Sequence, residues 1–265
     1  MSQSGNGQMP VVSVESVGVS SGEAAPPGRW KFWATSAWGL AIMGAWVTAQ
    51  FAVFLAILLT QPIPDLAAAH RLVHSGLTLA VVSVGSAPFG LGALALAVWL
   101  SGRPFWSYLG VVAPSRSDWI VGLVCLAVLL AVADFSARLL GHGVMPTFVS
   151  DMYRGAREAG ALPLLALALV VIAPVTEELI FRGFLFRGWA ASPLGAGGAI
   201  LLTSFLWAAA HVQYDLFYMT LIFVLGLLFG WLRQRSGSTV LTMGLHGIVN
   251  LWALLQAALL IPRLP

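Results

Sequence analysis

Charged side chains are scarce in this 265-residue sequence. Asp, Glu, Lys and Arg make up 9% of the residues, whereas soluble domains average about 25%. Hydrophobic residues make up 59%, and the mean hydropathy is +0.89. So few charges cannot cover a surface that faces water, which excludes an ordinary soluble domain. The length suits one membrane domain rather than several soluble ones.

Cysteine is nearly absent, and the basic residues are not clustered. Cys125 is the single cysteine, so neither an intrachain disulfide nor a zinc–thiolate set can form. The formal charge is only +3, and the basic residues are scattered along the chain. A nucleic-acid surface would need a basic stripe. We therefore expect the lipid bilayer, and no nucleic acid, as the surroundings of this chain.

Long apolar runs are what the sequence does contain. A hydrocarbon core of ~30 Å needs about 20 apolar residues in a helix. The sequence offers seven such runs, at about 33–60, 77–100, 119–140, 161–190, 197–213, 215–233 and 238–261. Because they are continuous rather than alternating, they are not barrel strands. We predict an all-α, polytopic transmembrane helix bundle of about seven helices, with room for an eighth, shorter one at 143–160.

The predicted helices divide the chain into three parts. Residues 1–28 are rich in Ser, Gly, Val and Pro and are interpreted as a disordered tail, because they lack the pattern of a signal peptide. Gly18, Ser20 and Gly22 form a G-x-S-x-G there, which is a chance match without a strand before it and a helix after it. Residues 29–160 hold the N-terminal transmembrane helices, and residues 161–265 hold the candidate catalytic core.

The basic residues near the helix ends predict an orientation, because Lys and Arg favour the cytoplasmic side. One side would hold Arg29, Lys31, Arg103, Arg116, Arg187, Arg233 and Arg235, and the other Arg71, Arg154, Arg157 and Arg263. This bias favours a cytoplasmic N-terminus. The preference for Arg over Lys and the many Ala and Gly residues are typical of a GC-rich bacterial genome, so we expect a bacterial plasma membrane protein.

Two glutamates and an arginine interrupt the fourth apolar run. Ionisable residues inside a membrane are costly and mark functional sites by default. Glu178 and Arg182 are at i and i+4, with the acid first, which favours an ion pair within the helix. Glu177 points about 100° away and has no partner in its own segment. Pro174, one turn earlier, should bend the helix or loosen its hydrogen-bond ladder.

The fifth and seventh apolar runs contain two histidines and an asparagine. His211 follows Trp207 by one turn near the end of the fifth run. His246 and Asn250 are at i and i+4 in the seventh run, so they share one face. An Asn in an apolar helix needs a hydrogen bond, which it can make between helices. Gly226 and Gly230 form a G-x-x-x-G that we expect to pack within the bundle.

The candidate residues lie at compatible depths. From the turn at 191–196, Glu177 is ~20 Å away and His211 ~23 Å away, and His246 and Asn250 are ~14 to 20 Å from the turn at 234–237. All four can therefore meet inside the bilayer. A buried glutamate can take a proton from water, a histidine can position that water, and a His–Asn pair can donate to an oxyanion. This set describes amide hydrolysis without a covalent intermediate.

The ordered motifs resemble those of the CPBP intramembrane proteases, which include the type II CAAX prenyl endopeptidases. They read Glu177-Glu178-Leu-Ile-Phe-Arg182, Trp207-Ala-Ala-Ala-His211 and His246-Gly-Ile-Val-Asn250, and the resemblance covers about 160–255. It implies that Glu177 and His211 activate water and that His246 and Asn250 hold the oxyanion. Glu178, Arg182 and Trp207 would order the site. The second motif commonly begins with Phe, and Trp207 keeps an aromatic there.

A metal is the first alternative. One Glu and two His could bind zinc, but there is no H-E-x-x-H, and a zinc site would lack an obvious spare base. The resemblance implies metal-independent catalysis, so we expect no cofactor.

The expected function is an endopeptidase that cuts a membrane-anchored or lipidated polypeptide near its terminus. A prenylated CAAX protein, a bacteriocin precursor and a C-terminal sorting signal all fit. The alternative is a non-catalytic immunity or adaptor protein that retains the fold. A small transporter with a proton relay is less favoured, because the sequence shows no internal repeat of the kind found in many transporters.

Overall fold

The computed structural model describes residues 30–60 and 65–261, and every regular element within them is a helix. The expected tail at 1–28 lies outside these residues. Six helices are long and apolar enough to cross a membrane: α1 (Phe32–Thr60), α3 (Gly76–Leu100), α5 (Arg116–Leu139), the continuous helix Leu162–Ala190, α11 (Leu216–Ser236) and α12 (Thr239–Leu260). Shorter helices are α2 (Leu66–Val73), α4 (Phe105–Leu109), α6 (Thr147–Glu158) and α10 (Gly195–Ala209). The all-α polytopic bundle is therefore confirmed.

The fifth apolar run is shorter as a helix than as a run. The run extends to residue 213, but α10 ends at Ala209 after 15 residues, which is about 22 Å of helix. The chain then turns, and the Asp215 carboxylate accepts the N–H of Tyr218 at 3.1 Å to cap α11. Each of the seven predicted runs forms a helix, and six of these helices are long enough to span a bilayer.

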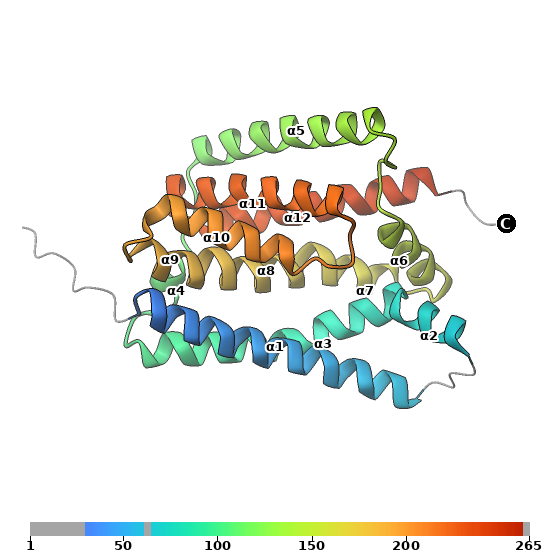
Figure 1. Ribbon diagram of the computed structural model, residues 1–265, viewed down its shortest axis with the longest axis horizontal. Coiled ribbons are helices and arrows are strands. Elements are labelled where there is room, and N and C mark those ends of the chain that lie inside the picture. The colour runs from blue at the N-terminus through green and yellow to red at the C-terminus, as the bar shows by residue number, and fades with distance from the viewer. Residues whose placement is uncertain (1–29, 61–64, 262–265) are drawn as a thin grey trace, which may run out of the picture.

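The helix Leu162–Ala190 lies at the centre of the bundle (Figure 1). Helices α1 and α3 pack along each other on one side of it, and the α10–α11 hairpin and α12 lie on the other side. Helix α5 packs outermost, against α11 and α12. Helices α2 and α6 lie at the end of the bundle opposite α4 and the start of α1.

The outer surface of α5 shows what surrounds the bundle. A stripe of large apolar side chains at helical spacing is more than half exposed: Ile120, Val124, Val128, Val132, Phe135 and Leu139. A soluble protein would not keep such a continuous apolar stripe in water. This surface fits the hydrocarbon of a lipid bilayer.

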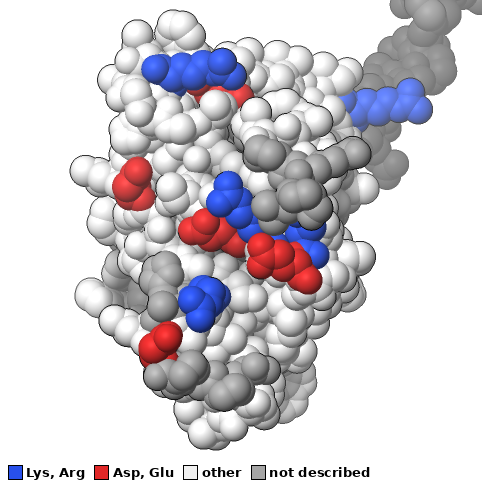
Figure 2. Space-filling view, turned by 90° about the vertical axis from the view of Figure 1, so that its right-hand side faces the viewer, with Lys and Arg blue, Asp and Glu red and all other residues white. Residues whose placement is uncertain are grey.

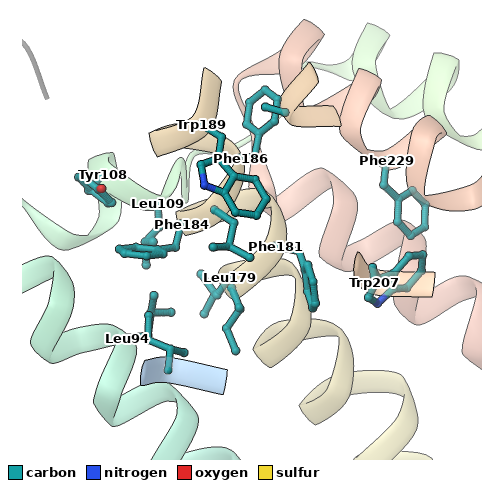
Figure 3. Packing of buried hydrophobic residues seen from close by; sticks show 14 of the residues in the cluster. Leu94, Tyr108, Leu109, Leu179, Phe181, Phe184, Phe186, Trp189, Trp207 and Phe229 are labelled. Carbon is teal, nitrogen blue, oxygen red and sulfur yellow. The ribbon is translucent and has the colours of Figure 1, made fainter. Parts of the chain in front are cut away.

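Close helix packing holds the interior. Figure 3 shows Leu94, Leu109, Phe184 and neighbouring side chains of the buried core around the central helix. Small residues set the helix distances, because tight packing drives association in lipid. A Cβ added at Gly226 would lie 2.9 Å from the Ser204 Cβ, and one at Gly230 would lie 2.9 Å from Ile200. The G-x-x-x-G motif thus packs α11 on α10 within the chain.

The central helix is not uniformly α-helical. It runs as α7 (Leu162–Leu167), η1 (Ala168–Ile172), α8 (Ala173–Glu178), η2 (Leu179–Leu185) and α9 (Phe186–Ala190), where η1 and η2 are π-helical. The Ala173 N–H donates to the carbonyl of Ala168, five residues back, and Pro174 has no N–H. The loosened ladder expected around Pro174 is present. The π-helical turns flank the two glutamates, and such turns are frequent at functional sites.

Candidate active site

A cavity of about 590 Å³ brings the three motifs together. Its walls come from α1, α2, α3, α6, the η1–α8–η2 part of the central helix, α10 with the turn that follows it, and α12. The lining includes five of the residues that the sequence singled out: Glu177, Trp207, His211, His246 and Asn250. The residues that the sequence places at compatible depths therefore line one cavity.

Glu177 faces the cavity from α8. Its Oε2 accepts a hydrogen bond from the Trp207 indole Nε1 at 2.6 Å, and its side chain is half-buried. Among the described residues it has no salt bridge within 4.0 Å. Trp207 itself is only 2% exposed, so it fixes one oxygen of the carboxylate and leaves the other oxygen to the cavity.

Glu178 and Arg182 lie behind the cavity wall, and both side chains are fully buried. Their ion pair has an N–O distance of 2.9 Å, as the i, i+4 spacing predicted. The Arg182 guanidinium also donates to the Gly226 carbonyl at 3.3 Å and lies 4.4 Å from the centre of the Trp207 ring. The pair thereby joins the central helix to α10 and α11.

His211 lies in the turn after α10 with a defined ring orientation. Its Nδ1 is 2.7 Å from the Trp207 carbonyl oxygen. A carbonyl can only accept, so Nδ1 carries the hydrogen, and Nε2 of the neutral ring keeps its lone pair. The Trp207 ring packs edge-on against the imidazole at 5.4 Å. His211 therefore offers a proton acceptor at the cavity.

His246 faces the same space from α12. Its Nδ1 is 3.1 Å from Glu178 Oε1, so the carboxylate that receives Arg182 also receives this ring. Only 4% of His246 is exposed. As an imidazolium the ring can donate from Nε2 as well, with the carboxylate that pairs with Arg182 beside it. Glu178 Oε1 thus forms polar contacts with both the arginine of the first motif and the histidine of the third.

Asn250 completes the hydrogen bonding of the central helix. Its Nδ2 donates to the Leu169 carbonyl at 2.7 Å. That carbonyl lacks a helical donor, because the Ala173 N–H is directed to Ala168 and Pro174 has none. One N–H of the Asn250 amide is used in this way, and the amide has a second N–H to offer. The interhelical bond expected for an Asn in an apolar helix is present.

Gln50 and Tyr214 are among the polar cavity residues that the sequence analysis did not single out. Gln50 reaches the cavity from α1, and Tyr214 reaches it from the turn that carries His211. The Tyr214 ring lies 6.0 Å from the His211 ring at 19° and meets Phe148 of α6 edge-on. Burial, together with the negative charge of Glu177, raises the pKa of Tyr214 to about 12. The sequence signals were a lone amide in an apolar run and a tyrosine three residues after His211.

A metal site would need a cluster of ligating side chains. Among residues 30–60 and 65–261, no three His, Cys, Asp or Glu side chains are grouped so that they could hold a metal ion. His246 directs one nitrogen to Glu178 rather than to Glu177. The expectation of a site without a cofactor stays a prediction.

Comparison with known proteins places the chain in a family. Residues 159–252 match a family model described as type II CAAX prenyl endopeptidase Rce1-like. An Escherichia coli protein named "Uncharacterized 24.3 kDa protein" is 32% identical over 161 residues, which is 57% of this chain and 70% of that protein. The chain belongs to the CPBP family. All seven residues singled out in its motifs lie within the matched CPBP region.

A second relative of this CPBP member is the UPF0177 protein YxdF of Lactococcus lactis subsp. lactis (strain IL1403). It is 24% identical over 143 residues, which is 52% of this chain and 75% of YxdF. No solved structure matches the chain. Membership in the CPBP family and the six apolar helices make the protein an integral membrane protein with the fold of a CAAX-type intramembrane protease.

Proposed function

We propose that this CPBP member is an intramembrane endopeptidase that hydrolyses a peptide bond of a membrane-associated or lipidated polypeptide near its terminus. One observation carries the proposal. The half-buried carboxylate of Glu177, which has no salt bridge among the described residues, and the Nε2 acceptor of His211 face one apolar-walled cavity. A glutamate and a histidine in that arrangement suit general-base activation of water.

In the proposed reaction, a water molecule lies between Glu177 Oε1 and His211 Nε2. Glu177 takes a proton as the water oxygen bonds to the substrate carbonyl carbon. The negative oxygen of the tetrahedral intermediate accepts hydrogen bonds from the His246 imidazolium and the second N–H of Asn250. The C–N bond then breaks, and the proton passes from Glu177 to the leaving nitrogen. Trp207, Glu178 and Arg182 hold these groups in place.

The cavity lining supports an internal cut rather than removal of a C-terminal residue. No Lys or Arg is among the lining residues that the structure describes. A peptidase that recognises a free carboxyl terminus would need a cationic or similar donor set for the carboxylate. The apolar walls instead suit an uncharged segment that arrives from the bilayer. Both relatives are bacterial, and we place the protein in a bacterial plasma membrane with a cytoplasmic N-terminus.

The test compares membranes that contain equal amounts of the wild type or of Glu177→Gln. New N-terminal and C-terminal peptides across the proteome are quantified by mass spectrometry. We expect a fragment that the variant forms about 10²- to 10⁴-fold more slowly, because the general base is lost.

The matched control is Glu158→Gln, which changes an exposed acid at the end of α6, outside the cavity lining. The control should keep the fragment. Identical profiles for all three proteins would instead favour the non-catalytic immunity or adaptor function.

A further inference from the structure

Gln50 is the single carboxamide side chain of α1. Ser36 and Thr60 of this helix donate to the carbonyls of Phe32 and Ile57 in the same helix, whereas the Thr35 hydroxyl and the Trp46 indole N–H are buried without a partner among the described residues. Among the described residues, the carboxamide of Gln50 has no hydrogen-bond partner. The amide is half-buried and lines the cavity, where it can donate and accept hydrogen bonds. Its polar group is therefore available to a molecule that enters the cavity.

Gln50 faces the cavity that holds the candidate catalytic groups. Met43, Val47, Gln50 and Phe54 follow the i, i+4, i+7, i+11 spacing of one helix face, and all four line the cavity. Helix α1 packs against α3 and the central helix, whereas α10 and α12 lie on the other side of the central helix (Figure 1). The half-buried Gln50 side chain thus belongs to a different wall from His211 and Asn250.

A substrate backbone in this cavity needs hydrogen-bond partners. Water can attack a peptide bond only where the segment is unwound, so the N–H and C=O groups beside that bond have lost their helical partners. In an apolar cavity each such group is costly if it stays unpaired. The Trp207 N–H and one N–H of Asn250 are already engaged. A carboxamide carries both a donor and an acceptor, so one glutamine can pair with a backbone C=O and N–H together.

We propose that Gln50 binds the backbone of the unwound substrate segment beside the scissile bond. The face Met43–Val47–Gln50–Phe54 of α1 is then one wall of the substrate cleft, with apolar contacts on either side of a single backbone-binding amide. The ligand class is an uncharged, apolar polypeptide segment in an extended conformation. This inference rests on the proposed function and specifies how that site holds its substrate.

The experiment measures binding without turnover. The full chain carrying Glu177→Gln is purified in detergent, and its affinity is measured for an acetylated and amidated heptapeptide of Ala, Leu and Phe. A set of analogues replaces one backbone N–H at a time by an ester oxygen. We expect one analogue to bind about tenfold more weakly than the parent peptide, as loss of one buried hydrogen bond predicts.

The variant Gln50→Met, of similar size but apolar, should bind the parent peptide about tenfold more weakly. It should also no longer distinguish the ester analogue from the amide. Without peptide, Gln50→Met should unfold at the same or a higher temperature, because it removes an unpaired amide. Thr48→Val, on an exposed position two residues away, is the control and should bind like the unchanged chain.

Three results would overturn the proposal. They are amide–ester discrimination that persists in Gln50→Met, a lower unfolding temperature for that variant without peptide, and no saturable binding of the peptide by the chain with Gln50 intact. Because binding is measured in the Glu177→Gln background, it is separate from cleavage. Absence of any Glu177-dependent fragment would refute the protease and leave the binding result standing. Cleavage by a protein that fails the binding test would refute only the role of Gln50.

Discussion

Glu177 and Glu178 are neighbours in the sequence and lie in different surroundings. Adjacent positions on an α-helix point about 100° apart around the helix axis. Glu178 is fully buried between Arg182 and His246, whereas Glu177 faces the cavity with the Trp207 N–H on one oxygen. The sequence predicted the ion pair from its local spacing. It could not show Trp207 or His246 as partners, because those contacts depend on how separate helices pack.

Because Glu178 is ion-paired and buried, we expect its substitution to lower the free energy of unfolding much more than substitution of Glu177. Glu178→Gln should lower the free energy of unfolding by about 3–5 kcal/mol, since it leaves the Arg182 cation buried and unpaired. Glu177→Gln should cost less than about 1 kcal/mol, because the amide oxygen still accepts one neutral hydrogen bond from Trp207. Denaturant unfolding in micelles measures both. A greater loss for Glu177→Gln would contradict this assignment.

We expect the ionisation of Tyr214, in the turn beside the site, to make the stability of the protein depend on pH. Burial and the charge of Glu177 raise its pKa from 10.0 to about 12. A raised pKa in the folded state means that the contribution of Tyr214 to stability is complete below pH 10 and falls as the pH rises towards 12. The tyrosinate absorbance of the wild type minus that of Tyr214→Phe should titrate near pH 12. A midpoint near pH 10 would show that the phenol is neither buried nor close to Glu177.

At the scale of the element, Pro174 shapes the active helix by removing one donor. The Leu169 carbonyl loses its helical partner, and Asn250, 81 positions away, takes it. The sequence predicted a loosened helix from the proline and a hydrogen-bonded amide from the asparagine. It did not connect the two, because the match depends on the register between η1 and α12.

This connection predicts a coupling between Pro174 and Asn250. Asn250→Leu alone should cost about 1–3 kcal/mol of unfolding free energy, because the half-buried Leu169 carbonyl is left without a protein donor. In a Pro174→Ala background the cost should be smaller, since the restored N–H gives the helix a donor of its own. A double-mutant cycle of unfolding free energies measures the difference. Additive effects would show that the proline does not determine the role of Asn250.

Hydropathy alone did not predict where α10 ends. The apolar run continues to residue 213, yet the helix ends at Ala209, because the turn and the Asp215 cap fix the start of α11. Helix rise is constant, so the sequence could place the motif residues at matching depths. Gln50 and Tyr214 were missed because depth does not tell which face of α1 or which side of a turn meets the cavity.

At the scale of the whole molecule, the two ends of the bundle differ in charge. The end with the start of α1 carries Lys31, Arg103, Arg116, Arg187 and Arg235, with Asp118 as the acid paired with Arg235. The opposite end mixes acidic and basic side chains (Figure 2), and α2 and α6 contribute exposed Arg71, Asp151, Arg154 and Glu158 to that end. Cavity residues Phe148 and Met152 belong to α6. The cavity therefore extends towards the less basic end.

This asymmetry predicts the membrane face that the cavity approaches. Because Lys and Arg favour the cytoplasmic side, the start of α1 should be cytoplasmic and α6 should lie outside. In a Cys125→Ser background, Asp151→Cys on α6 and Ser117→Cys in the first turn of α5 place single thiols at exposed positions on opposite ends. A membrane-impermeant maleimide should label position 151 in intact cells and position 117 only after lysis. The reverse labelling pattern would contradict this orientation. It would show that the cavity, and the bond it cuts, lie towards the cytoplasmic side.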